Sequence, residues 1–272
     1  MSSTGALRAH LPRARLAGPV ATTWEASLRS YRLFAARDPR MTLGLSPEGN
    51  GDEPDLLRLM TDKCGVCDDP VLVPGPDMID PMRTLAGLEA FAGRLSKAVS
   101  RRSPVLFETG HPHRLLGFYA ALADAASAVG CPVLTPAQGR CIDITTRFGV
   151  RTSRLDYVRG VAMVREPGAR NPGDGTGAHT HSPLSVRVVL DVAAASDGRL
   201  PGLVVGDYGW VCGAGQPGIE AIGPTDTDDS ALFVGEALGE GVGFAVSLDD
   251  AVRSAASLLL TRHVLDRACL SQ

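Results

Sequence analysis

The chain has 272 residues, with 27 basic and 30 acidic side chains and a formal net charge of −3. It therefore lacks the basic surface that a protein needs to bind nucleic acid through phosphate neutralisation. Hydrophobic residues make up 44% and charged residues 21% of the sequence, which is typical of a folded globular protein. No apolar run is long enough to span a bilayer. The six cysteines are too sparse for a disulfide scaffold, so we expect a cytoplasmic protein with no nucleic-acid or membrane partner.

The first 102 residues are predicted to form an N-terminal helical cap or flank. Residues 1–21 carry three arginines and no acid but lack the apolar core of a secretion signal. We expect a loose tail there, with a mitochondrial-type presequence as the alternative. Thr22 and Glu25 have the spacing of a capping box, and Asp80-Pro81 has the residues of a helix start. Helices are predicted over residues 22–38, 55–64 and 80–102.

Residues 103–272 are predicted to form a Rossmann-like catalytic domain, with a single integrated domain for the whole chain as the alternative. Short apolar runs alternate with amphipathic stretches, and Ser182-Pro183 opens one of the helices. Such alternation indicates a three-layer α/β fold, a mostly parallel, doubly wound sheet with helices on both faces. The glycine-rich residues 168–177 are a candidate mobile lid. Strands are predicted over residues 104–108, 131–135, 157–164, 203–206, 219–223 and 242–248.

Histidines and aspartates follow several of these strands. Ligands bind beyond the carboxyl ends of the strands in an open parallel sheet, so we expect these side chains to meet at one edge. Buried carboxylates that meet repel one another unless a cation joins them. We therefore predict a divalent ion, Mg²⁺ or Mn²⁺, because oxygen ligands suit hard cations. The predicted metal ligands are Asp207, Asp226 and Asp228.

The loop after the strand 104–108 has the features of a phosphate site. A threonine and a glycine precede a helix there, and N–H groups at a helix N-terminus attract anions. We expect a histidine to protonate the leaving alcohol as a general acid. The predicted catalytic residues are His111, His179 and Asp207. The predicted substrate-binding residues are Thr109, Gly110, His113, Arg114, His181, Ser182, Trp210 and Gln216.

Several motifs in the sequence resemble an actinobacterial family of proteins labelled phosphatases. They are Val105-Leu-Phe-Glu-Thr-Gly-His-Pro, His179-Thr-His-Ser-Pro, Val205-Gly-Asp-Tyr-Gly-Trp-Val-Cys-Gly-Ala-Gly-Gln and Asp226-Thr-Asp-Asp-Ser-Ala-Leu-Phe-Val-Gly-Glu. The order of the loops is also distantly similar to D-glutamate cyclase-like proteins, which are manganese-dependent lyases. The sequence departs from the phosphatase family at Tyr208, where histidine is usual, and at Asp228-Asp229, where Asn-Asp is usual. These departures are compatible with a specialised pathway and its own substrate.

The resemblance and the residues together predict a metal-assisted phosphatase. Its substrate would be a phosphomonoester of a small polar metabolite, such as a sugar or nucleoside phosphate. One alternative is a lyase, dehydratase or cyclase that uses the same cation, and another is a metabolite-binding module without turnover. The sequence lacks the G-x-S-x-G motif that presents the nucleophilic serine in α/β-hydrolases, so it does not support a serine hydrolase. A homodimer is compatible with the sequence.

Overall fold

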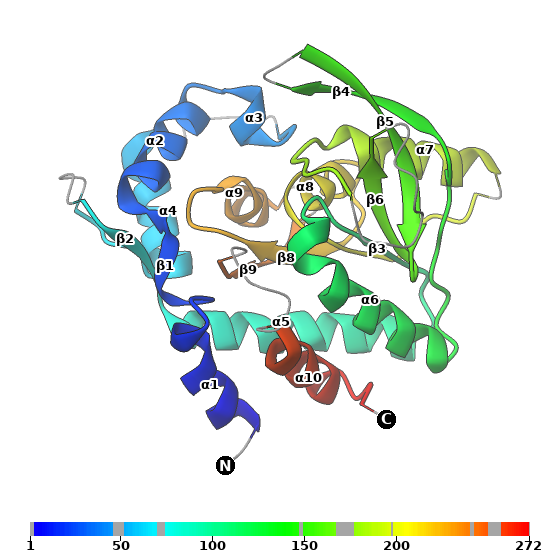
Figure 1. Cartoon of the computed structure of the whole chain (residues 1–272), viewed down its shortest axis with the longest axis horizontal. Helices are drawn as coiled ribbons and strands as arrows, with labels where there is room; N and C mark the ends of the chain where they lie inside the picture. The colour runs from blue at the N-terminus through cyan, green and yellow to red at the C-terminus, as the bar shows by residue number, and fades with distance from the viewer. Residues whose placement is uncertain are drawn as a thin grey trace.

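The computed structural model describes residues 3–45, 52–69, 74–146, 149–166, 177–196, 198–239, 242–249 and 257–271. The candidate lid at residues 168–177 lies, apart from Gly177, outside these ranges. Among the described residues, no helix has the length and apolarity needed to cross a membrane. Figure 1 shows strands of a central sheet covered by helices.

The strands are β1 (Gly18–Thr23), β2 (Pro76–Ile79), β3 (Val105–Glu108), β4 (Cys141–Thr146), β5 (Gly149–Val158), β6 (Val161–Arg165), β7 (Leu203–Val205), β8 (Ala221–Thr225) and β9 (Val242–Ser247). The helices are α1 (Ser3–Arg13), α2 (Trp24–Ala35), α3 (Pro39–Thr42), α4 (Glu53–Cys64), α5 (Pro81–Ser100), α6 (Pro112–Ala128), α7 (Leu184–Ser196), α8 (Tyr208–Gly215), α9 (Ala231–Leu238) and α10 (Ser257–Arg267).

The central sheet has the order β4-β5-β6-β3-β7-β8-β9. The strands from β6 to β9 are parallel, whereas β4 and β5 form an antiparallel extension at one edge. The mostly parallel, three-layer α/β fold predicted from the sequence is confirmed. The small separate sheet of β1 and β2 is antiparallel and was not predicted.

Two strand predictions were wrong in detail. The run predicted as one strand over 157–164 is divided at Arg159-Gly160, where both residues have positive φ and the chain reverses from β5 into β6. The predicted strand 131–135 makes only a single bridge, between Val133 and Val105. Proline at 132 and at 136 limits the ladder there, because proline has no N–H to donate. The strand that pairs with β3 on the side of Val133 is β6, and the two run parallel.

Strand side chains alternate between two hydrophobic layers, as the period of two in a β-strand requires. Phe107 of β3 belongs to the layer under α1, α5, α6 and α10. Its neighbour Leu106 belongs to the layer under α2, α4, α7, α8 and α9. Both layers draw on the N-terminal and the C-terminal parts of the chain (Figure 1).

The N-terminal segment is ordered where a loose tail was expected. It forms α1, whose Leu7 and Leu11 are buried in the core with α5 and α10. The cap of α2 is Thr23, which accepts a hydrogen bond from the backbone N–H of Ala26. The predicted cap, Thr22, lies in β1 instead and donates its hydroxyl to Asp226. At α5 the Asp80 cap is confirmed, since its carboxylate accepts from the Met82 N–H.

The order of the strands predicts a crevice beyond the carboxyl ends of β3 and β7. These strands are parallel neighbours, but the chain leaves β3 toward β6 and leaves β7 toward β8. Their following helices, α6 and α8, pack in opposite layers. In doubly wound sheets ligands bind at such a point, beyond the carboxyl ends of the two strands.

Candidate metal centre

Asp207 links the ends of these two strands, β3 and β7, through hydrogen bonds. It is fully buried and follows β7. Its carboxylate accepts hydrogen bonds from the Thr109 hydroxyl and from the Gly110 N–H, both at 2.7 Å. The Thr109 hydroxyl in turn accepts from the His111 N–H at 2.9 Å. The two donors predicted to hold phosphate are therefore directed at Asp207.

Gly110 allows a loop to cross directly over the start of α6. A Cβ atom at this position would lie only 2.0 Å from the carbonyl oxygen of Thr180. The Thr180 N–H also donates to the Gly110 carbonyl at 3.0 Å. This close approach brings the segment 177–183 to the crevice, together with His179 and His181. The glycine is needed for backbone contact.

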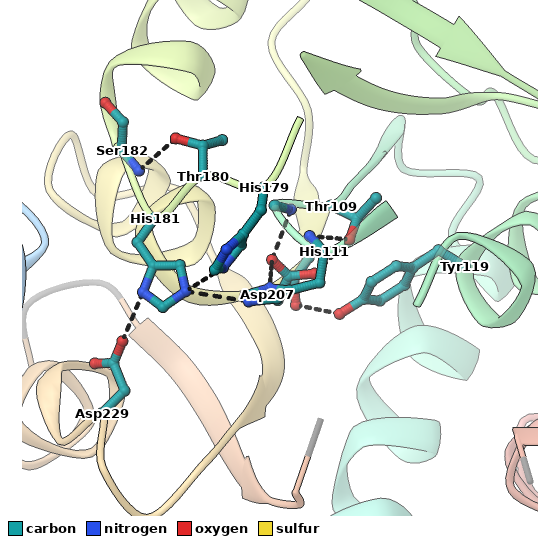
Figure 2. Close-up of polar contacts among 11 residues, drawn as sticks. Thr109, His111, Tyr119, His179, Thr180, His181, Ser182, Asp207 and Asp229 are labelled. Carbon is teal, nitrogen blue, oxygen red and sulfur yellow. Dashed lines mark hydrogen bonds and ion pairs between the residues drawn. The ribbon is translucent and has the colours of Figure 1, made fainter. Parts of the chain in front are cut away.

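Three imidazoles converge where the two segments meet. His111 is buried, His181 is partly exposed and His179 is exposed. The His181 Nε2 atom lies 3.1 Å from His111 Nε2 and 2.9 Å from His179 Nε2 (Figure 2). Among the described residues, these three form a group whose ligand atoms all lie within 4.8 Å of one another and that could hold a metal ion.

Carboxylates lie behind two of the three imidazoles. His111 Nδ1 is 3.5 Å from Asp207 Oδ1, and His181 Nδ1 is 3.5 Å from Asp229 Oδ2 (Figure 2). A neutral imidazole that carries its proton on Nδ1, toward a carboxylate, presents a lone pair at Nε2. The Nε2 lone pairs of His111 and His181 would then face each other at 3.1 Å. A cation between them removes this repulsion, and carboxylate–histidine–metal arrangements have this geometry.

The ring of Tyr208 packs against two of the imidazoles. Its ring stacks on His181 with 4.3 Å between centroids and lies 4.5 Å from His111. Tyr208 has a φ of 47°, a conformation that is uncommon outside glycine and often found at functional sites. Neither Tyr208 nor Asp229 was predicted from the sequence to take part in the site. The position of Asp229 after β8 was the one signal for it.

Glu108 is a buried acid beneath the crevice. It ends β3, is fully buried, and neither carboxyl oxygen has a hydrogen-bond partner among the described residues. Burial, with a smaller effect of the negative charge on Asp207, raises the pKa of Glu108 well above its usual value. Burial thus favours the neutral form of this carboxyl group over the charged form.

The other predicted substrate contacts lie in different surroundings. His113 and Arg114 are exposed on the first turn of α6. Trp210 is completely buried in α8, within the hydrophobic layer. Gln216 is exposed and donates its amide to the Gly44 carbonyl. Ser182 lines a cleft beside the histidines.

The predicted metal ligands are not brought together. Among the described residues, Asp207, Asp226 and Asp228 do not form a group with ligand atoms within 4.8 Å of one another. Asp226 accepts hydrogen bonds from the Thr22 hydroxyl and the Thr227 N–H. Burial, and then the charges of Asp228 and Asp249, raise the pKa of Asp226 well above its usual value. Asp207 after β7 and Asp226 after β8 therefore accept hydrogen bonds from different residues.

The cleft beside the centre has a volume of about 680 Å³, within the usual range for small-molecule sites. His179 and His181 form part of its wall. The remainder comes from α3, from β4–β6 and from the segment 178–184. The histidine cluster therefore opens onto a space large enough for a metabolite.

The fold and the site together define a class of protein. It is a doubly wound α/β protein with a three-histidine centre at its topological switch point. A family model described as Phosphatase matches residues 2–272. The protein named Phosphatase SCO2771, from Streptomyces coelicolor (strain ATCC BAA-471 / A3(2) / M145), is 39% identical over 253 residues, covering 93% of this chain and 90% of that protein. This chain therefore belongs to the phosphatase family. Neither comparison supports the likeness to D-glutamate cyclases or the lyase alternative.

Proposed function

We propose that this protein is a phosphomonoesterase whose His111, His179 and His181 hold a catalytic divalent metal ion. Membership of the phosphatase family supports the reaction class. The convergence of three Nε2 atoms, with carboxylates behind two of the imidazoles, carries the metal assignment. Three histidines with an open position for water or substrate are a known catalytic donor set for zinc.

The donor set also favours one kind of metal. Imidazole nitrogen suits Zn²⁺, Fe²⁺ and similar ions, whereas Mg²⁺ prefers oxygen ligands. The sequence predicted Mg²⁺ or Mn²⁺; we propose a metal of the zinc type as the first choice and keep Mn²⁺ as the second. Such an ion would polarise a phosphoryl oxygen and lower the pKa of a bound water.

The protein residues have separate roles in this scheme. Asp207 and Asp229 orient His111 and His181 through their Nδ1 atoms and fix the tautomer that leaves Nε2 available. Metal ligation uses the same Nε2 atoms that a general acid would use, so we propose ligation in place of the proton transfer expected for His111 and His179. Because the cleft borders His179 and His181, the phosphate group would enter from that side.

The test combines metal removal with phosphate release. The protein is treated with a chelator, its metal content is measured by plasma mass spectrometry, and hydrolysis of sugar and nucleoside phosphates is followed before and after adding Zn²⁺, Fe²⁺, Mn²⁺ or Mg²⁺. We expect loss of turnover on metal removal and recovery with Zn²⁺, Fe²⁺ or Mn²⁺ but not Mg²⁺.

Two controls make this result specific. His179→Ala should lose both metal and turnover, whereas His113→Ala, which removes an exposed histidine of α6, should keep both. Asp226→Asn should also retain the metal, in contrast to the ligand set expected from the sequence. Full turnover by the metal-free protein would contradict the proposal.

A further inference from the structure

The cleft beside the histidines has a floor built from three strands. In the antiparallel extension, Ile144 pairs with Arg151 and Leu155 pairs with Val164. Directly paired residues share one face of a sheet, and so do residues two apart. Ile144, Ser153 and Val164 therefore lie on the same face, and all three line the cleft. The middle of this floor is apolar apart from one serine hydroxyl.

Short helix α3 forms the opposite wall. Arg40, Met41 and Thr42 line the cleft from this side, and Figure 1 shows α3 across from the end of the sheet that carries β4. Met41 is partly exposed and packs against the adjoining hydrophobic layer. Met41 is thus a cleft-lining side chain that belongs to no part of the metal centre.

Hydroxyl-bearing side chains also line the cleft. They come from the floor, from α3, and from the segment that carries the two histidines. An occupant that matches this lining has hydroxyl groups at its edges and a hydrocarbon face toward Ile144 and Val164. The hydroxyl-bearing residues are Thr42, Thr145, Thr146, Ser153, Thr180 and Ser182.

The charges around the cleft are balanced in its described part. Arg151 pairs with Glu166 at 2.9 Å and Arg40 pairs with Asp38 at 2.9 Å, while Asp143 accepts the Thr152 hydroxyl. A second anionic group on a substrate would meet acids as well as arginines. The described lining also offers no Phe, Tyr or Trp ring on which a nucleobase could stack.

From these observations we infer that the cleft between α3 and β4–β6 binds the alcohol part of the substrate, and that this part is an uncharged sugar or polyol. The inference rests on the proposed phosphatase function and assigns substrate selection to Met41 and the sheet floor. A hexose monophosphate meets the lining described above, whereas a nucleotide or a sugar bisphosphate does not.

The test compares substrates of different size in matched variants. Met41→Trp should lower kcat/KM for hexose phosphates by about 10-fold or more while changing that for glycerol phosphate by less than about 2-fold. Met41→Ala should shift the ratio in the opposite direction. Met82→Trp makes the same exchange on α5, at a side chain that is 50% exposed and outside the cleft, and should change neither value.

A binding measurement keeps this result separate from the proposed function. The affinity of the metal-loaded protein for a non-hydrolysable hexose phosphonate is measured by calorimetry, which requires no turnover. Binding that Met41→Trp weakens supports the inference even if no phosphate ester is hydrolysed. Three results would overturn it: a preference of the natural protein for nucleotides or bisphosphates, an equal effect of Met41→Trp on small and large substrates, or no phosphonate binding.

Discussion

Two acids of the same crevice, Glu108 at the end of β3 and Asp207 after β7, have opposite environments. Asp207 accepts two hydrogen bonds of 2.7 Å, from the Thr109 hydroxyl and the Gly110 N–H. Glu108 has no such partner among the described residues, and burial disfavours its charge. The crevice thus holds one acid that accepts hydrogen bonds beside the histidines and another whose pKa burial raises.

Glu108→Gln should change how stability depends on pH. Because the pKa of Glu108 is raised in the folded state, the folded protein keeps a proton that the unfolded chain releases above about pH 4.5. The stabilisation is complete below this pH and is lost as the pH rises toward the folded pKa, at up to about 1.4 kcal/mol per pH unit. Glutamine has the same shape and does not titrate.

Urea unfolding between pH 5 and pH 9 measures this effect. The stability of the natural protein relative to Glu108→Gln should fall as the pH rises. Glu25→Gln, at an exposed position in the first turn of α2, serves as the control and should show no comparable slope. A difference that is constant with pH would mean that Glu108 is ionised in the folded protein.

Among the elements, α6 carries the strictest local requirement. His111 is its N-cap, and Gly110 directly before it lies under the Thr180 carbonyl. The start of this helix and the segment 177–183 can approach only because residue 110 lacks a side chain. Further along the same helix, a Cβ atom added at Gly117 would meet no other atom within 4 Å.

Gly110→Ala and Gly117→Ala should therefore have opposite effects. The first would displace the segment that carries His179 and His181, and should destabilise the fold by about 1–3 kcal/mol and reduce the bound metal. The second replaces an exposed helical glycine and should stabilise the protein by about 0.5–1 kcal/mol. Denaturant unfolding and metal content measure both effects, and a Gly110→Ala protein with natural metal content would refute the role of the crossing.

Some of these elements could be predicted from the sequence, and others could not. The parallel core was predictable, because buried apolar runs such as Val105–Glu108 alternate with amphipathic helices. The antiparallel β4–β5 extension was not, since its exposed face gives Cys141–Thr146 a weak apolar signal. The three histidines of the centre were among the predicted site residues, whereas Asp229, which lies behind His181, was not. Whether Asp226 or Asp229 faces a histidine depends on the backbone after β8, which spacing alone does not show.

For the whole molecule, a metal at the centre would join the loop after β3, which carries His111, to the segment that carries His179 and His181. A ligand that binds only the folded state raises the free energy of unfolding, by about 2.7 kcal/mol at a concentration 100 times its Kd. Thermal unfolding of the chelator-treated protein should therefore shift upward on addition of Zn²⁺, and His179→Ala should show no shift. An unchanged midpoint for the natural protein would contradict the metal centre.

The spacing of the histidines along the chain has a consequence for how the protein folds. His179 and His181 are neighbours in sequence, but His111 is 70 residues from His181 and Asp207 is 97 residues from Gly110. Closing such large loops is slow and costs entropy. We therefore expect the three histidines to meet only after β3 and β6 have paired, because His111 follows β3 and the segment with His179 and His181 follows β6. A bound metal ion would consequently stabilise the chain only once the sheet has formed. It would slow unfolding but would not guide the early steps of folding.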